Sequence, residues 1–237
     1  MTKPPQTLSI ITVVKDDPIG LFKTAQSVKE QREVFPSIEH VIIDGASGKE
    51  TQAVLSEVGQ SADIVRSEPD SGIYDAMNKG IDRSSGEALL FLNAGDVFVG
   101  PVLQNLTQVP SFLPVKYVDF FGRLKDRPIV HHWTGIPNCH QGIVFERTDV
   151  RYDLQYAIAS DYDYFLRHGY TWRLNRTPSD AGYILFDNAG VNTQKVTQRD
   201  REIRAIRTNH FGPVIGNMFE LKPFAKRIVR KCLGRLT

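Results

Sequence analysis

A loop, an amphipathic helix and a buried strand follow one another between residues 67 and 96, and this succession most constrains the fold. The segment SEPDSGIYDAMNKGI at 67–81 predicts a loop that leads into a helix with an apolar face. The run 88–92 is continuously apolar, as in a strand covered on both faces. The strand ends at Asn93, and Asp96 follows it. Because open α/β sheets bind ligands just beyond the carboxyl ends of their strands, we expect a binding site here.

Strand and helix patterns alternate through the first hundred residues, which predicts an α/β fold with a mostly parallel central sheet flanked by helices. No repeat or low-complexity linker divides the chain, so we expect a single domain. Its parts are a Rossmann-like half at 1–100, a second half at 101–215 and a basic amphipathic helix at 216–237. Strands are expected at 8–14, 40–44, 63–67, 87–93, 129–133, 142–146, 172–175 and 183–186 and within 115–122. Helices are expected at 19–31, 49–58, 73–82, 161–168, 198–209 and 219–236 and near 102–106.

Composition limits the classes of partner and compartment. The chain has 237 residues, of which 41% are hydrophobic, enough for a sizeable core. A net charge of +2 gives no general attraction to nucleic acid, so we expect no nucleic-acid partner. Cys139 and Cys232 do not make a disulfide framework, and the start MTKPPQT lacks the apolar core of a signal peptide. With no run long enough to span a bilayer, we expect a cytoplasmic chain.

Further segments continue the pattern in order along the chain: SIITVVKD at 9–16, VIIDGASGKET at 41–51, LNAGD at 92–96, HQGIVFER at 140–147 and ASDYDYFLR at 159–167. Together with SEPDSGIYDAMNKGI, they resemble the family-2 glycosyltransferases of the GT-A fold, and in particular bacterial enzymes of exopolysaccharide and colanic-acid-type synthesis. The rest of the chain matches more loosely.

The resemblance implies an inverting transfer of a hexosyl or N-acetylhexosaminyl group. The donor would be a UDP- or GDP-linked sugar bound by the first half of the chain. The acceptor, bound by the second half, would be a polysaccharide or a lipid-linked oligosaccharide.

The resemblance also implies a set of donor-binding residues. Asp44 would accept a hydrogen bond from the base or ribose, Asp70 would contact the nucleotide, and Lys79 would pair with phosphate. The full set is Thr12, Val14 and Asp16 at the base, Asp44, Asp70 and Lys79, and His140 and Gln141 near the diphosphate or the acceptor. Ordinary local roles also fit: Asp44 can open a turn, Asp70 can cap a helix, and Lys79 can lie on a solvated face.

A divalent cation is the usual means of neutralising a departing diphosphate, and Mg²⁺ takes one or two carboxylates besides phosphate oxygens. Where the family pattern resembles Asp-x-Asp-Asp, this chain has Asn93-Ala94-Gly95-Asp96. The resemblance therefore implies that Asp96, helped by the amide oxygen of Asn93, binds Mg²⁺ or Mn²⁺. The same four residues would also suit a simple tight turn.

Asp161 is the candidate general base, because the family shows a Glu-Asp pair at the start of a helix that runs on to an Arg. Here the pair is Ser160-Asp161, and the helix runs to Arg167. A base must lie within hydrogen-bond reach of the acceptor hydroxyl. Asp163 lies about 160° further round the helix and should face elsewhere. In the structural alternative, Ser160 caps the helix and Asp161 lies in its first turn.

Three other interpretations remain. Zinc binding would use His131, His132, Cys139 and His140, but neighbouring strand residues point to opposite faces. A nucleotidyltransferase would need a Gly-rich basic loop after the first strand, which ITVVKDDPIG lacks. A catalytically silent sugar-nucleotide-binding subunit of a membrane-associated assembly is suggested by the missing carboxylates at Asn93, Gly95 and Ser160.

The C-terminal segment LKPFAKRIVRKCLGRLT at 221–237 interleaves basic and apolar residues at helical spacing. Such a helix is typical of binding to a membrane surface, so we expect peripheral contact with the inner face of the cell membrane. The alternative is a helix packed on the domain with a solvated basic face.

Overall fold

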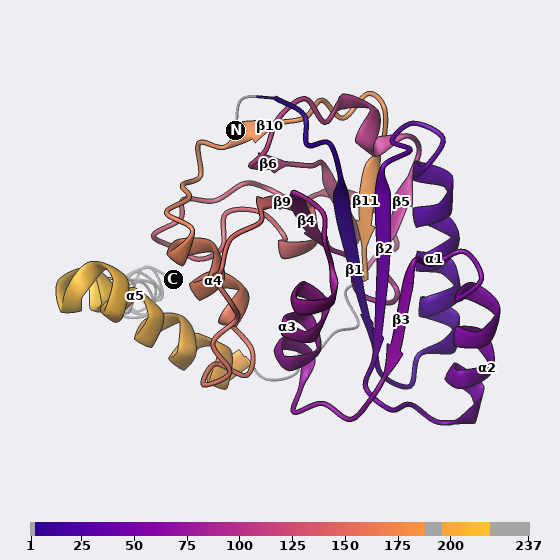
Figure 1. The fold of residues 1–237 in the computed structure, drawn as a ribbon. Helices are drawn as coiled ribbons and strands as arrows, with labels where there is room; N and C mark the ends of the chain where they lie inside the picture. Colours follow the sequence, from indigo (N-terminus) through magenta and orange to yellow (C-terminus); the bar gives the residue numbers. More distant parts are fainter. Residues whose placement is uncertain (1–2, 188–195, 219–237) are drawn as a thin grey trace.

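The computed structural model describes residues 3–187 and 196–218, and its centre is a seven-stranded sheet (Figure 1). The strand order is β10-β6-β9-β4-β1-β2-β3. The neighbours β3, β2, β1 and β4 are parallel, and β9 runs antiparallel to β4, so the expected mostly parallel sheet is confirmed. The bounds are β1 Leu8–Val14, β2 Ile38–Asp44, β3 Ile64–Ser67, β4 Ala88–Phe91, β6 Ser111–Phe112, β9 Ile143–Glu146 and β10 Asn175–Arg176.

A second sheet has the order β5-β11-β7-β8, with β5 at Val97–Val99, β11 at Tyr183–Phe186, β7 at Val115–Val118 and β8 at Leu124–Asp126. The strand expected at 129–133 was wrong, because a tight turn at 119–123 returns the chain as β8 instead. Residues 129–133 form a loop in which Val130 N donates to Pro137 O at 2.8 Å. The strand expected at 172–175 begins only at Asn175.

Helices cover both faces of the central sheet. In Figure 1, α1 (Pro18–Gln31) and α2 (Lys49–Val58) lie on one side, and α3 (Ile73–Arg83) lies on the other, with α4 (Ser160–Arg167) beyond it. Two short 3₁₀ helices are η1 (Val102–Asn105) and η2 (His140–Gly142). None of the helices formed by residues 3–187 and 196–218 is long and apolar enough to cross a membrane.

The last described helix, α5 (Val196–Met218), packs against α4 and extends from the body of the molecule (Figure 1). It kinks at Gly212, whose φ is 81°, and Pro213 follows. The helix passes the boundary expected at 215, and the helix predicted for 219–236 lies outside the described residues.

The strands are apolar on both faces because both faces are covered. On β1, Ile11 packs with Met77 of α3, whereas Val14 packs with Leu21 of α1. Fully burying one such aliphatic side chain contributes about 1.5–3 kcal/mol. A Cβ on Gly80 of α3 would lie 2.4 Å from Ile11 Cγ2, so this helix sits close against the sheet. The layers therefore fix the loops at the carboxyl ends of the strands.

Candidate active site

A cavity of about 790 Å³ opens beyond the carboxyl end of β4. The start of α3, the short helix η2, the start of α4 and one face of α5 form its walls. Four residues singled out in the sequence line it together: Asn93, His140, Gln141 and Asp161. Residues nearly 70 positions apart in the chain thus line the same cavity. Its wall also contains four arginines, Arg127, Arg199, Arg204 and Arg207. No motif in the sequence pointed to Arg127, which follows β8.

Asp161 lies in the first turn of α4 and carries a perturbed carboxyl group. Its Oδ1 accepts from Tyr162 N at 2.8 Å and lies 3.4 Å from the hydroxyl of Tyr74. Burial raises the pKa of Asp161 to about 6, and these hydrogen bonds and the charge of Arg127 only partly oppose the rise. A carboxylate with a pKa near neutrality is suited to accepting a proton at physiological pH.

The chain that leads into α4 is held by Glu202 of α5. The Glu202 carboxylate accepts from Ile158 N at 2.8 Å, Ala159 N at 2.9 Å and Ala157 N at 3.2 Å. This position was missed in the sequence, where Glu202 is one acid in an arginine-rich helix. The capping alternative for Ser160 is wrong, since the N-cap is Ala159 and the Ser160 hydroxyl donates to Asp153 O at 2.9 Å.

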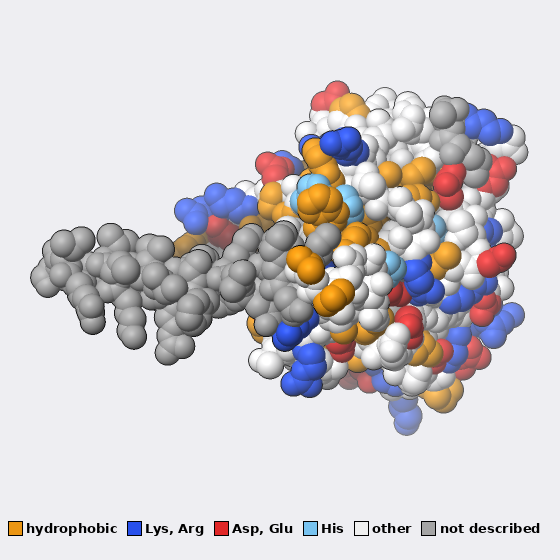
Figure 2. Space-filling view, turned by 90° about the vertical axis from the view of Figure 1, so that its left-hand side faces the viewer, with side chains coloured by type: hydrophobic (Ala, Val, Ile, Leu, Met, Phe, Trp, Pro, Cys, Tyr) orange, Lys and Arg blue, Asp and Glu red, His pale blue; other side chains and the backbone are white. Residues whose placement is uncertain are grey.

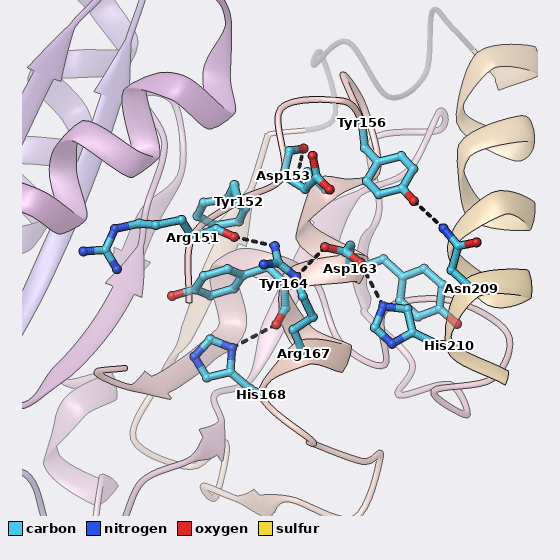
Figure 3. Close-up of polar contacts among 12 residues, drawn as sticks. Arg151, Tyr152, Asp153, Tyr156, Asp163, Tyr164, Arg167, His168, Asn209 and His210 are labelled. Carbon is cyan, nitrogen blue, oxygen red and sulfur yellow. Dashed lines mark hydrogen bonds and ion pairs between the residues drawn. The ribbon is translucent and has the colours of Figure 1, made fainter. Parts of the chain in front are cut away.

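Asp163 faces away from the cavity, as expected from its angle round the helix. Figure 3 shows it between Arg167 of the same helix and His210 of α5. The Arg167 Nε–Asp163 Oδ2 distance is 2.7 Å, and the His210 Nε2–Asp163 Oδ1 distance is 2.8 Å. Asp163 therefore joins α4 to α5, and Asp161 alone of the two carboxylates lines the cavity.

Asp96 is buried behind the cavity wall, where its carboxyl group hydrogen-bonds the side chain of the lining residue Gln141. Its Oδ1 accepts from Asp187 N at 2.9 Å, and burial raises its pKa to about 8. Gly95 has a φ of 98°, and a Cβ there would lie 3.0 Å from Asp187 Oδ2. The carboxylate of Asp187 thus lies beside Gly95, within the contact distance of a side chain at position 95. Asp187 was missed, although it follows a strand end just as Asp96 does.

The oxygen atoms around Asp96 fit a hard divalent cation. The Oδ1 atom of Asn93 is buried and has no hydrogen-bond partner. The described parts of the chain hold no group of three or more His, Cys, Asp or Glu side chains that could bind a metal on their own. Asp96, Asp187 and the orphaned amide oxygen therefore suit an ion that takes its remaining ligands from phosphates.

His140 and Gln141 reach the cavity from η2. His140 Nε2 lies 2.6 Å from Tyr152 Oη, and burial lowers its pKa to about 3, so the imidazole is neutral. The Gln141 Oε1 atom accepts from the Cys139 thiol at 2.8 Å. Burial raises the pKa of Cys139 to about 12, which disfavours the thiolate that zinc would require.

The loops after β1, β2 and β3 bring two predicted donor-binding carboxylates together. Asp44 is buried and accepts from Ser67 Oγ at 2.6 Å and from Gln52 Nε2 at 2.7 Å. Burial opposes its ionisation, but these bonds and those from Ser47 hold its pKa below the ordinary value. A Cβ on the next residue, Gly45, would lie 2.3 Å from Asp70 Oδ2. Asp70 therefore lies against the Asp44 loop.

Like Asp44 and Asp70, the remaining predicted donor residues do not line the cavity. The Thr12 hydroxyl lies 3.0 Å from His40 Nε2, and Val14 packs against α1. Asp16 lines a separate hollow of about 410 Å³, and its carboxylate accepts from the backbone. Lys79 donates to Pro69 O at 2.6 Å and pairs with a carboxylate one turn away. Their roles toward a donor stay predictions.

Aromatic rings lie beside the rim of the cavity. The His131 ring is 4.4 Å from Trp133 and 5.4 Å from Trp172, measured between centroids. Thr134 and Gly135, the next residues, line the cavity itself. Figure 2 shows hydrophobic and histidine side chains gathered on the face of the molecule turned toward the viewer. This arrangement suits contact with a ligand that extends beyond the cavity.

Comparison with known proteins decides the family. The model of the family described as Glycosyl transferase family 2 matches residues 9–114. An uncharacterized glycosyltransferase of Mycobacterium tuberculosis is 36% identical over 217 residues, which cover 82% of this chain and 80% of the relative. The chain belongs to glycosyltransferase family 2. A PGL/p-HBAD biosynthesis glycosyltransferase of Mycobacterium bovis is 30% identical over 158 residues, covering 57% of this chain and 60% of that one.

Solved structures share the fold at low sequence identity. Staphylococcus aureus TarS 1–349 in complex with UDP has a TM-score of 0.64 at 16% identity and covers 92% of this chain and 72% of its own. The mannosyltransferase PcManGT from Pyrobaculum calidifontis, in complex with GDP-Man and Mn²⁺, has a TM-score of 0.57 at 14% identity. That match covers 100% of this chain and 82% of the mannosyltransferase. The GT-A fold expected for this family 2 member is confirmed.

Proposed function

We propose that this family 2 glycosyltransferase transfers a hexosyl or N-acetylhexosaminyl group, with inversion, from a UDP- or GDP-linked sugar to a saccharide or lipid-linked acceptor. One observation carries the proposal: Asp161, with its raised pKa, faces the same cavity as Asn93, with Asp96 directly behind. The proposed proton acceptor and the proposed diphosphate-binding residues would thus lie at the same cavity. A sugar between them would meet both groups that a direct displacement needs.

In the proposed reaction, the acceptor hydroxyl lies within hydrogen-bond reach of Asp161. Its oxygen forms the new bond to the anomeric carbon, and the bond from that carbon to the diphosphate oxygen breaks. The hydroxyl proton passes to the Asp161 carboxylate, and the nucleoside diphosphate leaves with the electron pair. Because the attack comes from the face opposite the leaving group, the configuration inverts. Arg127 and the arginines of α5 would favour anionic groups in the cavity.

Asp96, Asp187 and Asn93 would hold Mg²⁺ or Mn²⁺. When bound, the ion supplies charge neutralisation for the departing diphosphate. The support is the orphaned amide oxygen of Asn93, the two adjoining carboxylates, and the Mn²⁺ in the mannosyltransferase of the same fold. Asp44 and Asp70 are proposed to contact the nucleoside, since they lie together at the carboxyl ends of β2 and β3.

A lipid-linked acceptor would bring the enzyme to the inner face of the cell membrane. The basic amphipathic segment at 221–237, which lies outside the described residues, remains a proposed membrane contact. TarS binds UDP and UDP-GlcNAc and the mannosyltransferase binds GDP-Man, so both nucleotide classes are candidates for the donor.

Calorimetric titration with a panel of UDP- and GDP-sugars, with and without Mn²⁺, tests the proposed donor. We expect one nucleotide class to bind at least tenfold more tightly than the other, with a further gain of tenfold or more from Mn²⁺, because the protein offers few metal ligands without phosphate. Release of nucleoside diphosphate from the preferred donor then tests turnover. Binding without release across a set of saccharide and lipid-linked acceptors would instead favour the silent subunit. No binding of either class would contradict the proposal.

The raised pKa of Asp161 predicts an acid limit on the reaction. A general base works only when deprotonated, so kcat/KM should fall about tenfold per pH unit below pH 6 and level off above it. Without burial the limit would lie near pH 4. Initial rates measured between pH 4.5 and 8.5 would show it. In Tyr74→Phe, which removes a hydrogen bond that lowers this pKa, the limit should move to higher pH. A flat profile down to pH 4.5 would rule out Asp161 as the base.

A further inference from the structure

The hairpin formed by β7 and β8 exposes two phenylalanines at its tip. Phe120 is 96% exposed, the highest value for a large hydrophobic side chain among the described residues, and Phe121 is 75% exposed. The two rings meet edge to face at 5.6 Å. Val118 and Leu124, where the strands meet the turn, are each 45% exposed. Contiguous apolar surface of this kind marks an interaction site.

The turn holds these rings in place. The Asp119 carboxylate accepts from Phe121 N, Arg123 N and Arg123 Nε, each at 2.9 Å. Gly122, with a φ of 76°, donates its N–H to Asp119 O at 2.9 Å. The Arg123 guanidinium lies 4.9 Å from the centroid of the Phe121 ring. The exposure of the two phenylalanines is therefore built into the turn.

Basic side chains follow the apolar tip on both strands. Residues 115–127 contain four cations and two anions: Lys116, Arg123, Lys125 and Arg127, with Asp119 and Asp126. Asp119 pairs with Arg123 at 2.9 Å within the turn, and Asp126 pairs with Lys116 at 3.4 Å, so the four cations and two anions leave the hairpin a net charge of +2. An apolar tip with cations behind it is complementary to an anionic bilayer, where rings enter the acyl boundary and cations meet headgroups.

The size and shape of the tip favour a bilayer over a protein partner. Two phenylalanines offer roughly 300–500 Å² of surface, whereas a stable protein interface needs about 800 Å² from each side. A narrow convex tip reaches that area poorly on a protein surface. Insertion into a bilayer requires no complementary groove.

The base of the hairpin is joined to the wall of the cavity. Arg127 N donates to Val115 O at 2.8 Å, and Arg127 itself lines the cavity. A Cβ on Gly142 of η2 would lie 2.3 Å from Val115 Cγ2, so the start of β7 packs against the helix that carries His140 and Gln141. Five residues of extended chain separate this base from the tip, or about 16 Å.

We propose that the tip of the β7–β8 hairpin inserts into anionic lipid bilayers and holds the cavity close to the headgroup layer. The contact depends on the hairpin alone. The membrane contact can therefore be tested without any activity measurement. Only its use in presenting a lipid-linked acceptor rests on the proposed function.

The test is an environment-sensitive fluorophore on the tip of the full chain. Phe120→Cys is labelled in a Cys232→Ser background, since Cys139 is buried. We expect a blue shift and at least a twofold rise in emission with phosphatidylglycerol-phosphatidylcholine vesicles. Pure phosphatidylcholine should give much less. The same label at Ile19→Cys, on α1 and 67% exposed in the native residue, is the matched control and should not respond.

Vesicle sedimentation supplies a second measurement. Phe120→Ser combined with Phe121→Ser should weaken binding to anionic vesicles at least threefold, whereas Ile19→Ser should bind as the parent chain does. Unchanged nucleotide affinity would show that the variants are folded. Vesicle binding without a response of the label at 120 would overturn the proposal, because the contact would then lie elsewhere. A response that rises with protein concentration in the absence of vesicles would overturn it in favour of a protein contact.

Discussion

Asp161→Asn is expected to lower the rate of transfer by about 10²–10⁴-fold, the range typical for loss of a general base. Asparagine keeps the size of the side chain and can still accept from Tyr162 N, but it cannot take the acceptor proton. Donor affinity should stay within about twofold of the parent, as measured by calorimetry. Turnover close to that of the parent chain would contradict the assignment of Asp161 as the general base.

The stability of this variant should not fall. Because burial raises the pKa of Asp161, the ionised carboxylate disfavours the folded state, and stability declines as the pH rises from about 4 through 6. Asparagine removes that cost, so the free energy of unfolding at pH 8 should be unchanged or higher by up to about 3 kcal/mol. Denaturant unfolding at pH 5 and pH 8 measures the difference.

Asp163→Asn is the matched control on the same helix. It removes the charge that pairs with Arg167 and His210, so we expect a loss of about 1–3 kcal/mol in the free energy of unfolding. Transfer by the folded variant should remain within about threefold of the parent, because Asp163 faces α5. Opposite effects of the two substitutions would separate chemistry from structure on one helix.

Asp96→Asn is expected to lower transfer by about 10²-fold or more and to weaken Mn²⁺ binding in the presence of nucleoside diphosphate. The amide can still accept from Asp187 N, so the local packing should persist, but an amide oxygen binds a divalent cation more weakly than a carboxylate does. Electron paramagnetic resonance of free Mn²⁺ measures the metal affinity apart from activity. Metal affinity equal to that of the parent would contradict the role of Asp96.

Two comparisons sharpen this result. Asp187→Asn should also weaken Mn²⁺ binding, by roughly tenfold, if its carboxylate lies in the metal site beside Gly95. Asp82→Asn removes an exposed carboxylate whose side chain pairs with Arg151 on the surface, and it should change neither metal affinity nor transfer. An effect of Asp82→Asn equal to that of Asp96→Asn would point to a general electrostatic influence.

The sequence was informative where short-range patterns decide the outcome. Continuous apolar runs located β1 and β2, and helix α2 was located to the residue. The reason is that the spacing of apolar residues in a covered strand or helix reflects which of its faces are buried. The same patterns placed Asp96 and Asp161 at element ends. Beyond residue 100 the strands are short, and β8 could not be told from 129–133 because a single turn decides where the chain reverses.

The sequence by itself determined the α/β class, the family and the carboxylates that follow strands or begin helices. Only the tertiary structure decided which of them share a space. It joined Asp161 to Asn93 in one cavity, placed Asp187 beside the small residue Gly95, turned Asp163 toward α5, and left Thr12 and Val14 in packed layers. The physical reason is that a side chain's periodicity shows whether it is buried, whereas its partners depend on how distant elements pack.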